Sequence, residues 1–433
     1  MYKLGLRERE GIVTYGIDFG TSNTVVSVRG EDGRAGILEL AGQGRVVPSL
    51  MYFEDSGAVS IGHEALADYA AAIRSVGGSE GRTGHFRFFQ GLKFALRDRY
   101  FSGTKLFGRR WSIEQLVGLY LRRVRELAEE ATGEAAGLLV LGRPVSLSGD
   151  PASEPAILER YREAARLAGF AETRFVMEPV AAMSDIASAG GGELVLVFDF
   201  GGGTLDLTVA DLRGGAFRVL AALGADLGGY RINEDISRGR VARHFGYGST
   251  FRSMTGRELE IPGWITNQVA SFYALPLSDI VHTKAVIKDL LFEAREKRKL
   301  RGLMDFLGGN RWYELFDLID AAKIRLSSES SATIAFDLPP HVRFEEALGL
   351  GDFERLLEPR LREAAELVRR ALSAAGVGRE DIRKVVRVGG SSRIPAFARM
   401  LEAEFPGRVA EGEVFTSIAA GLIGAHESGH SAA

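Results

Sequence analysis

The sequence predicts an α/β protein of two similar lobes, with a ligand held where the lobes meet. One unusual phrase occurs twice, as YGIDFGTSNTVV over residues 15–26 and as LVFDFGGGTLDL over residues 196–207. In each copy an apolar run ends on Asp, Gly and Thr make a tight turn, and a second alternating run follows, which is the pattern of a β-hairpin. A repeat across half the chain indicates two subdomains that face one another. With 433 residues, 45% of them hydrophobic, the chain can bury a core in each lobe.

The composition excludes several classes of protein. The net charge of −3 and the pI near 6.2 give no general attraction to nucleic acid or to an anionic membrane. No cysteine is present, which rules out disulfides, thiolate metal sites and cysteine nucleophiles. The first ten residues carry no signal-peptide pattern, and no later stretch is apolar for long enough to span a bilayer. We therefore expect a cytoplasmic protein with neither nucleic acid nor a membrane as its partner.

The order of the other elements divides the chain. Residues 1–190 are expected to form the first lobe and residues 191–410 the second, because a glycine run at 190–192 separates them. The helix that closes the sequence, within residues 411–427, is expected to return to the first lobe, and residues 428–433 to form a flexible tail. The expected helices before it include 154–169, one opening at 178, 232–245, 277–303, 311–328 and 353–375.

Each hairpin turn carries groups that suit a phosphate and a hydrated cation. Glycine allows the turn to approach a phosphate closely and to direct backbone N–H groups at it. Asp18 and Asp199, at the ends of the first strands, stand where a hydrated Mg²⁺ could sit. A single hairpin of this kind would more often be plain structure. Its recurrence favours a phosphate clamp with two sides.

Five separated motifs together resemble the nucleotide-binding domain of the Hsp70 chaperones, within the superfamily of actin, Hsp70 and sugar kinases. They are the two hairpins, EPVAA at 178–182, DAAKIRLSS at 320–328 and VGGSSRIP at 388–395. The resemblance covers almost the whole chain, and the last motif is not usual in actin-type filament proteins. It implies an actin-like ATPase fold, in which two lobes, each built on a ribonuclease H-like β-sheet flanked by helices, enclose a nucleotide cleft. Because little sequence follows the last helix, we expect the compact, YegD-like form of the family, which lacks the peptide-binding domain.

The resemblance implies ATP or ADP with Mg²⁺ as the ligand, and it assigns residues motif by motif. The metal would be held through waters by Asp18 and Asp199, with Asp206 nearby. The residues around the γ-phosphate would be Asp18, Thr21, Lys93, Glu178, Asp199 and Thr204. The nucleotide would be bound by Gly20, Thr21, Ser22, Asn23, Gly201, Gly202, Gly203, Thr204, Asp320, Lys323, Ser327, Gly389, Gly390, Ser391 and Arg393.

Two of these residues have competing interpretations. Lys93 matches the family's lysine at the γ-phosphate, but most single lysines are merely solvated, and Lys105 lies close in the sequence. From the sequence alone, Glu178 is better explained as an acid that complements a helix N-terminus. The resemblance instead implies that it positions water and metal.

The chain departs from the family pattern at three places. Ile324 stands where the family has a second arginine that stacks on adenine, which leaves Arg393 as the main contact to the base. After Gly229 the family continues with acids, whereas this chain has YRIN at residues 230–233. An acid before the last helix is replaced within residues 414–417.

The sequence thus predicts an Hsp70-like ATP-binding protein that hydrolyses ATP slowly with Mg²⁺ and acts as a nucleotide-dependent switch in chaperone-type work. Client proteins and co-chaperones would be its partners, although the motifs identify none of them. The alternatives are an actin-like polymerising protein and a module that binds nucleotide without turnover. A sugar kinase has no dedicated acceptor motif here. The absence of any Gly-Lys dipeptide excludes a Walker-type P-loop.

Overall fold

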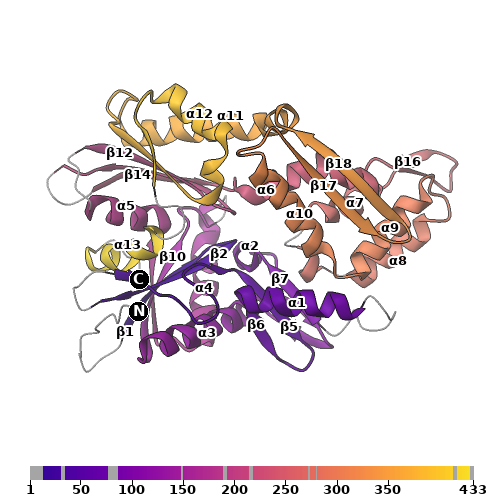
Figure 1. Ribbon diagram of the computed structural model, residues 1–433, viewed down its shortest axis with the longest axis horizontal. Helices are drawn as coiled ribbons and strands as arrows, with labels where there is room; N and C mark the ends of the chain where they lie inside the picture. Colours follow the sequence, from indigo (N-terminus) through magenta and orange to yellow (C-terminus); the bar gives the residue numbers. More distant parts are fainter. Residues whose placement is uncertain are drawn as a thin grey trace.

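Two β-sheets, one in each half of the chain, organise the molecule (Figure 1). The computed structural model describes residues 13–30, 35–76, 86–147, 150–188, 193–213, 218–271, 274–278, 280–412 and 417–429. The boundary expected at 190–192, the replaced acid expected near 414–416 and most of the expected tail lie outside these residues. The predicted α/β class is confirmed.

The first sheet has the strand order β11-β10-β1-β2-β3, with β4 paired to β2. Its strands are β1 (Val13–Phe19), β2 (Asn23–Arg29), β3 (Ala35–Ile37), β4 (Val47–Pro48), β10 (Ala136–Arg143) and β11 (Glu172–Met177). β1 and β2 form the predicted antiparallel hairpin, while β10 and β11 run parallel to β1. Helices α3 (Ile113–Thr132) and α4 (Glu154–Ala168) connect the parallel strands. A capping box of Ser112 and Gln115 opens α3.

The second sheet repeats this arrangement in the order β14-β13-β12-β19-β20. Its strands are β12 (Leu194–Phe200), β13 (Leu205–Asp211), β14 (Arg218–Ala225), β19 (Lys384–Val388) and β20 (Val409–Glu411). β12 and β13 form the second predicted hairpin, β14 adds antiparallel to β13, and β19 and β20 are parallel to β12. The repeat seen in the sequence therefore extends from one hairpin to a whole sheet.

Two helices separate the sheets (Figure 1). Helix α5 (Glu178–Ser188) packs against β12 and β13, and α13 (Ser417–Glu427) packs against β1 and against α5. The hydroxyl of Ser27 on β2 donates to the carbonyl of Ala419 at 2.6 Å. Any Cβ at Gly421 would collide with the backbone of Ala181, so this glycine allows α13 to approach α5 closely.

The outer parts of the two halves meet beyond the sheets. Tyr69 and Phe88 pack against Tyr313 at ring distances of 5.5 and 4.7 Å, and the Tyr69 hydroxyl donates to the carbonyl of Asn310 at 2.8 Å. The outer elements of the first half are β5 (Leu50–Glu54), β6 (Val59–Ile61), α1 (Gly62–Val76), β7 (Phe86–Gln90), α2 (Leu92–Arg97), β8 (Thr104–Leu106) and β9 (Arg109–Trp111). Those of the second half are α6 (Gly229–Ile236), β15 (Thr250–Arg252), β16 (Glu258–Glu260), α7 (Gly263–Thr266), α8 (Ile280–Leu290), α9 (Lys297–Gly308), α10 (Trp312–Arg325), β17 (Ser331–Leu338), β18 (Val342–Gly349), α11 (Leu350–Ala375) and α12 (Pro395–Glu404). Within the described residues, none of the helices has both the length and the apolar character needed to cross a bilayer.

The single helix predicted over residues 277–303 is wrong. The structure has α8 and α9 instead, with a turn between them. The backbone of that turn pairs with β15, because Arg252 N donates to Glu293 O at 3.1 Å and Arg295 N donates to Thr250 O at 3.0 Å. A continuous helix would have to give up both hydrogen bonds.

Candidate functional site

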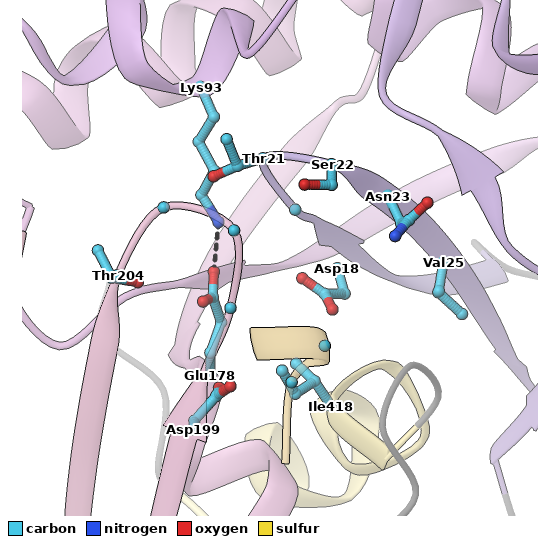
Figure 2. A pocket seen from close by; sticks show the side chains of 16 residues that line it. Asp18, Thr21, Ser22, Asn23, Val25, Lys93, Glu178, Asp199, Thr204 and Ile418 are labelled. Carbon is cyan, nitrogen blue, oxygen red and sulfur yellow. Dashed lines mark hydrogen bonds and ion pairs between the residues drawn. The ribbon is translucent and has the colours of Figure 1, made fainter. Parts of the chain in front are cut away.

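The turns of the two repeated hairpins face one another across a cavity of about 90 Å³ (Figure 2). The ends of α2, α5 and β19 complete its wall, together with α13. The lining residues are Asp18, Gly20, Thr21, Ser22, Asn23, Val25, Lys93, Glu178, Asp199, Gly201, Gly202, Gly203, Thr204, Gly389, Gly390 and Ile418. All of these except Val25 and Ile418 were predicted from the sequence. Residues as far apart in the chain as Asp18 and Ile418 therefore converge on one small site.

The first turn is held in place by a residue that the sequence did not single out. Ser49 N donates to the carbonyl of Ser22 at 2.8 Å, and the Ser49 hydroxyl donates to the carbonyl of Gly20 at 2.8 Å. Gly20 itself has no room for a side chain, because a Cβ there would collide with the carbonyl of Asn23. Ser49 thus holds the turn in place by donating to two of the turn's carbonyl groups.

The glycines of the second turn are required by close approach to the first turn. A Cβ on Gly202 would lie 2.5 Å from the hydroxyl oxygen of Ser22. A Cβ on Gly203 would lie 2.5 Å from the hydroxyl oxygen of Thr21. The two turns are therefore in contact across the cavity, and a larger residue at either glycine would push them apart.

Lys93 and Glu178 form a buried ion pair in the wall of the cavity (Figure 2). Lys93 Nζ lies 2.5 Å from Glu178 Oε1, and both side chains are less than 10% exposed. Burial disfavours the charge of Lys93, but the attraction of Glu178 outweighs it and holds the pKa of Lys93 above its usual value. Lys105 is exposed on β8. The structure thus places Lys93, and not Lys105, at the cavity.

Three buried aspartates add negative charge around this pair. Burial, together with the charge of Glu178, raises the pKa of Asp18 to about 7 and that of Asp206 to about 6, and it also raises the pKa of Asp199. Asp206 Oδ1 accepts a hydrogen bond of 2.8 Å from the N–H of Val145, which follows β10. Buried carboxylates in excess of nearby cations fit a divalent cation. The described residues contain no cluster of three acidic, His or Cys side chains that could hold a metal directly. Mg²⁺ in proteins usually keeps several of its own waters and takes only one or two carboxylates.

Comparison with known proteins agrees with this geometry. The model of the family described as Hsp70 protein matches residues 14–246 and 293–416. The chain belongs to the Hsp70 family. Its actin-like ATPase fold is therefore confirmed, and the segment between the two matched regions carries β15, β16, α7 and α8.

Proteins from distant organisms are similar to the chain. The chaperone protein DnaK of Thermus thermophilus is 28% identical over 411 residues, which are 89% of this chain and 56% of that protein. DnaK of Thermoplasma acidophilum is 26% identical, over 92% of this chain and 55% of its own length. The rice heat shock 70 kDa protein BIP3 is 28% identical, over 91% of this chain and 53% of its own length. The chain thus spans about half the length of the curated relatives it matches.

Further residues predicted from the Hsp70 motifs gather beside the cavity, where α10 meets the start of α6. Lys323 Nζ lies 2.5 Å from Asp320 Oδ1, which also accepts a 2.7 Å hydrogen bond from Asn233 Nδ2. The Ser391 hydroxyl donates to the carbonyl of Gly201 at 2.8 Å. Asn233 lies in the segment 230–233, where the sequence departs from the family pattern. The sequence gives no sign that it contacts Asp320, and the fold brings the two together. These residues form a polar edge next to the second turn.

Three further residues of these motifs concern the predicted binding of adenine. Arg393 is largely exposed, and its Nε lies 2.9 Å from Glu411 Oε1. Ile324 is 60% exposed at the end of α10. Ser327 follows that helix, and its N–H donates to the carbonyl of Ile324 at 3.0 Å. Contacts from Arg393 and Ser327 to a nucleotide therefore stay predictions.

Proposed function

We propose that this member of the Hsp70 family binds ATP and ADP with Mg²⁺ between the two hairpin turns, and that it hydrolyses ATP slowly. The observation that carries the proposal is the contact of the two glycine turns around a buried Lys93–Glu178 pair and buried aspartates. Two of the similar proteins named above are chaperones by name. By analogy we infer a nucleotide-dependent switch in chaperone-type work in the cytoplasm, with client proteins or co-chaperones as partners.

Each part of the site has a role in this proposal. The backbone N–H groups of both turns would bind the terminal phosphate. Lys93 would offset negative charge that develops on the phosphoryl oxygens, and Glu178 would orient the attacking water. Mg²⁺ would neutralise phosphate oxygens, with its waters held by Asp18 and Asp199. No covalent intermediate is needed, since positioning and charge stabilisation account for phosphoryl transfer to water.

The raised pKa values predict that binding of Mg-nucleotide releases protons. A carboxyl group whose pKa is higher in the folded protein than in the unfolded chain stabilises the fold at low pH. For Asp18 this contribution is lost as the pH rises from about 4 to about 7. A bound cation favours the ionised form. Binding should therefore tighten as the pH rises toward 7, and at about pH 6 its heat should depend on the ionisation enthalpy of the buffer.

Calorimetry with MgADP at about pH 6, in two buffers of different ionisation enthalpy, measures the number of protons released. Asp18→Asn is the control, because it removes a buried carboxyl group whose pKa is raised to about 7. Equal heats in both buffers for the parent protein would contradict the expected proton release.

The switch can be separated from its alternatives by solution size and shape. ATP would contact both turns, whereas ADP lacks the γ-phosphate that bridges them, so the two nucleotides should favour different angles between the lobes. Small-angle scattering and sedimentation with ADP and a non-hydrolysable ATP analogue report both shape and assembly. Growth into large polymers with ATP would favour the actin-like alternative. Identical scattering in all states would argue against a switch, and binding without turnover would leave a nucleotide-binding module.

A further inference from the structure

Tyr230, the second residue of α6, touches both hairpin turns at once. Its side chain is buried, with 7% of its surface exposed. Its backbone N–H donates to the carbonyl of Gly202 at 2.9 Å, and the side chain of Ser22 lies near its hydroxyl. A Cβ on Gly202 would lie 3.3 Å from the edge of the tyrosine ring. One side chain from the second half thus joins the turn of its own lobe to the turn of the first lobe.

The same ring also connects α10 to α2. Tyr230 stacks on Phe316 of α10 at 5.1 Å, and it meets Phe94 of α2 edge-on at 5.3 Å and 82°. Phe94 directly follows Lys93, and a Cβ on Gly203 would lie 3.5 Å from its ring. Leu92, Ala95 and Leu96 anchor α2 in the core of the first lobe. The contact with Tyr230 therefore links the Lys93 segment to the second lobe.

We infer that Tyr230 is a positioning residue that couples closure of the cleft to the placement of Lys93. Opening the lobes would break the ring contact of Tyr230 with Phe94 and move Tyr230 away from Ser22, because both residues belong to the first lobe. α2 is short, Leu92–Arg97, so a contact at Phe94 acts one residue from the ammonium-bearing side chain. The inference rests on the proposed hydrolysis for its consequence for rate, but its structural part does not require turnover.

The test compares Tyr230→Phe, Tyr230→Leu, Phe94→Leu and the double leucine variant. Losing the hydroxyl alone should lower kcat about threefold, and losing the hydroxyl and the ring together should lower it roughly tenfold. The KM for MgATP should change by less than about threefold, since the contacts lie outside the substrate. The double variant should be little slower than Tyr230→Leu, because both substitutions break one contact. Tyr247→Leu, at a partly exposed tyrosine, is the matched control.

A second measurement follows α2 itself. Hydrogen exchange of residues 92–97 should be faster in Tyr230→Leu than in the parent, both without nucleotide and with MgADP, whereas Tyr247→Leu should leave it unchanged. Thermal unfolding of each variant shows whether it still folds. If the leucine variants do not fold, the kcat and hydrogen exchange of Tyr230→Phe test the inference instead. Parent-like exchange in α2, or additive losses of kcat in the double variant, would overturn the inference. If the parent does not hydrolyse ATP, the proposed function fails, and exchange in the nucleotide-free protein still decides the role of Tyr230.

Discussion

Lys93→Ala is expected to hydrolyse ATP at least ~10²-fold more slowly than the parent, the loss typical of removing one electrostatic stabiliser. ADP binding should be nearly unchanged, because the lysine acts at the γ-phosphate end of the site. The position of Nζ in the cavity wall, 2.5 Å from Glu178, is the basis for this expectation. Single-turnover hydrolysis measures the rate, and calorimetry with MgADP measures the affinity.

The control variants are chosen because Lys105 is exposed, whereas Lys93 and Glu178 are buried. Lys105→Ala, on the exposed side of β8, should behave as the parent does. Lys93→Ala leaves Glu178 buried without a counter-charge, which can cost about 3–5 kcal/mol of folding stability. Lys93→Met combined with Glu178→Gln removes both charges and keeps side chains of similar length, so it separates lost chemistry from lost stability. Turnover at the parent rate in Lys93→Ala would assign the role to another group.

Gly389→Ala is expected to reduce nucleotide affinity more than tenfold and to lower the free energy of unfolding by roughly 3 kcal/mol. Gly389 has a left-handed φ of 80°, and its added Cβ would lie 2.5 Å from the carbonyl oxygen of Phe200 and 2.9 Å from Asp199 Oδ1. Relieving these contacts would shift the end of β12 together with Asp199. Denaturant unfolding and titration with MgADP measure the two effects.

Gly376→Ala provides the matched control for this substitution. Gly376 also has a left-handed φ, of 68°, but no neighbouring atom lies within 4 Å of an added Cβ. It should therefore show only the backbone cost of about 1–2 kcal/mol, with normal nucleotide binding. Equal effects at Gly389 and Gly376 would mean that contact with β12 is unimportant.

Much of the architecture could be predicted because local and global signals agree. The alternating runs around Asp18 and Asp199 specify hairpins by their period and their turn residues. Each hairpin became the first pair of strands of a sheet with the same order, and its turn became one wall of the cavity. Lys93 and Glu178 were expected from motif resemblance, and the fold brings them into contact although 85 residues separate them.

The remaining features depend on packing between distant segments. Ser49 and Tyr230 belong to no turn motif, and they act through hydrogen bonds and ring contacts that the order of residues does not reveal. The break between α8 and α9 arises from pairing of Glu293 and Arg295 with β15, which overrides helical periodicity. Arg393 pairs with Glu411 on the neighbouring strand, a partner that its motif does not reveal. Such partners are set by tertiary contacts, which local patterns do not encode.

Calorimetric titration of the parent protein with MgADP and MgATP tests the central claim most directly. We predict saturable binding of one nucleotide per chain, weaker binding of MgGTP, and a marked loss of affinity when Mg²⁺ is removed by a chelator, because buried carboxylates would then face the phosphates unscreened. Thermal unfolding should shift upward with the same ligands. No heat and no thermal shift with either adenine nucleotide would contradict a nucleotide site between the hairpins.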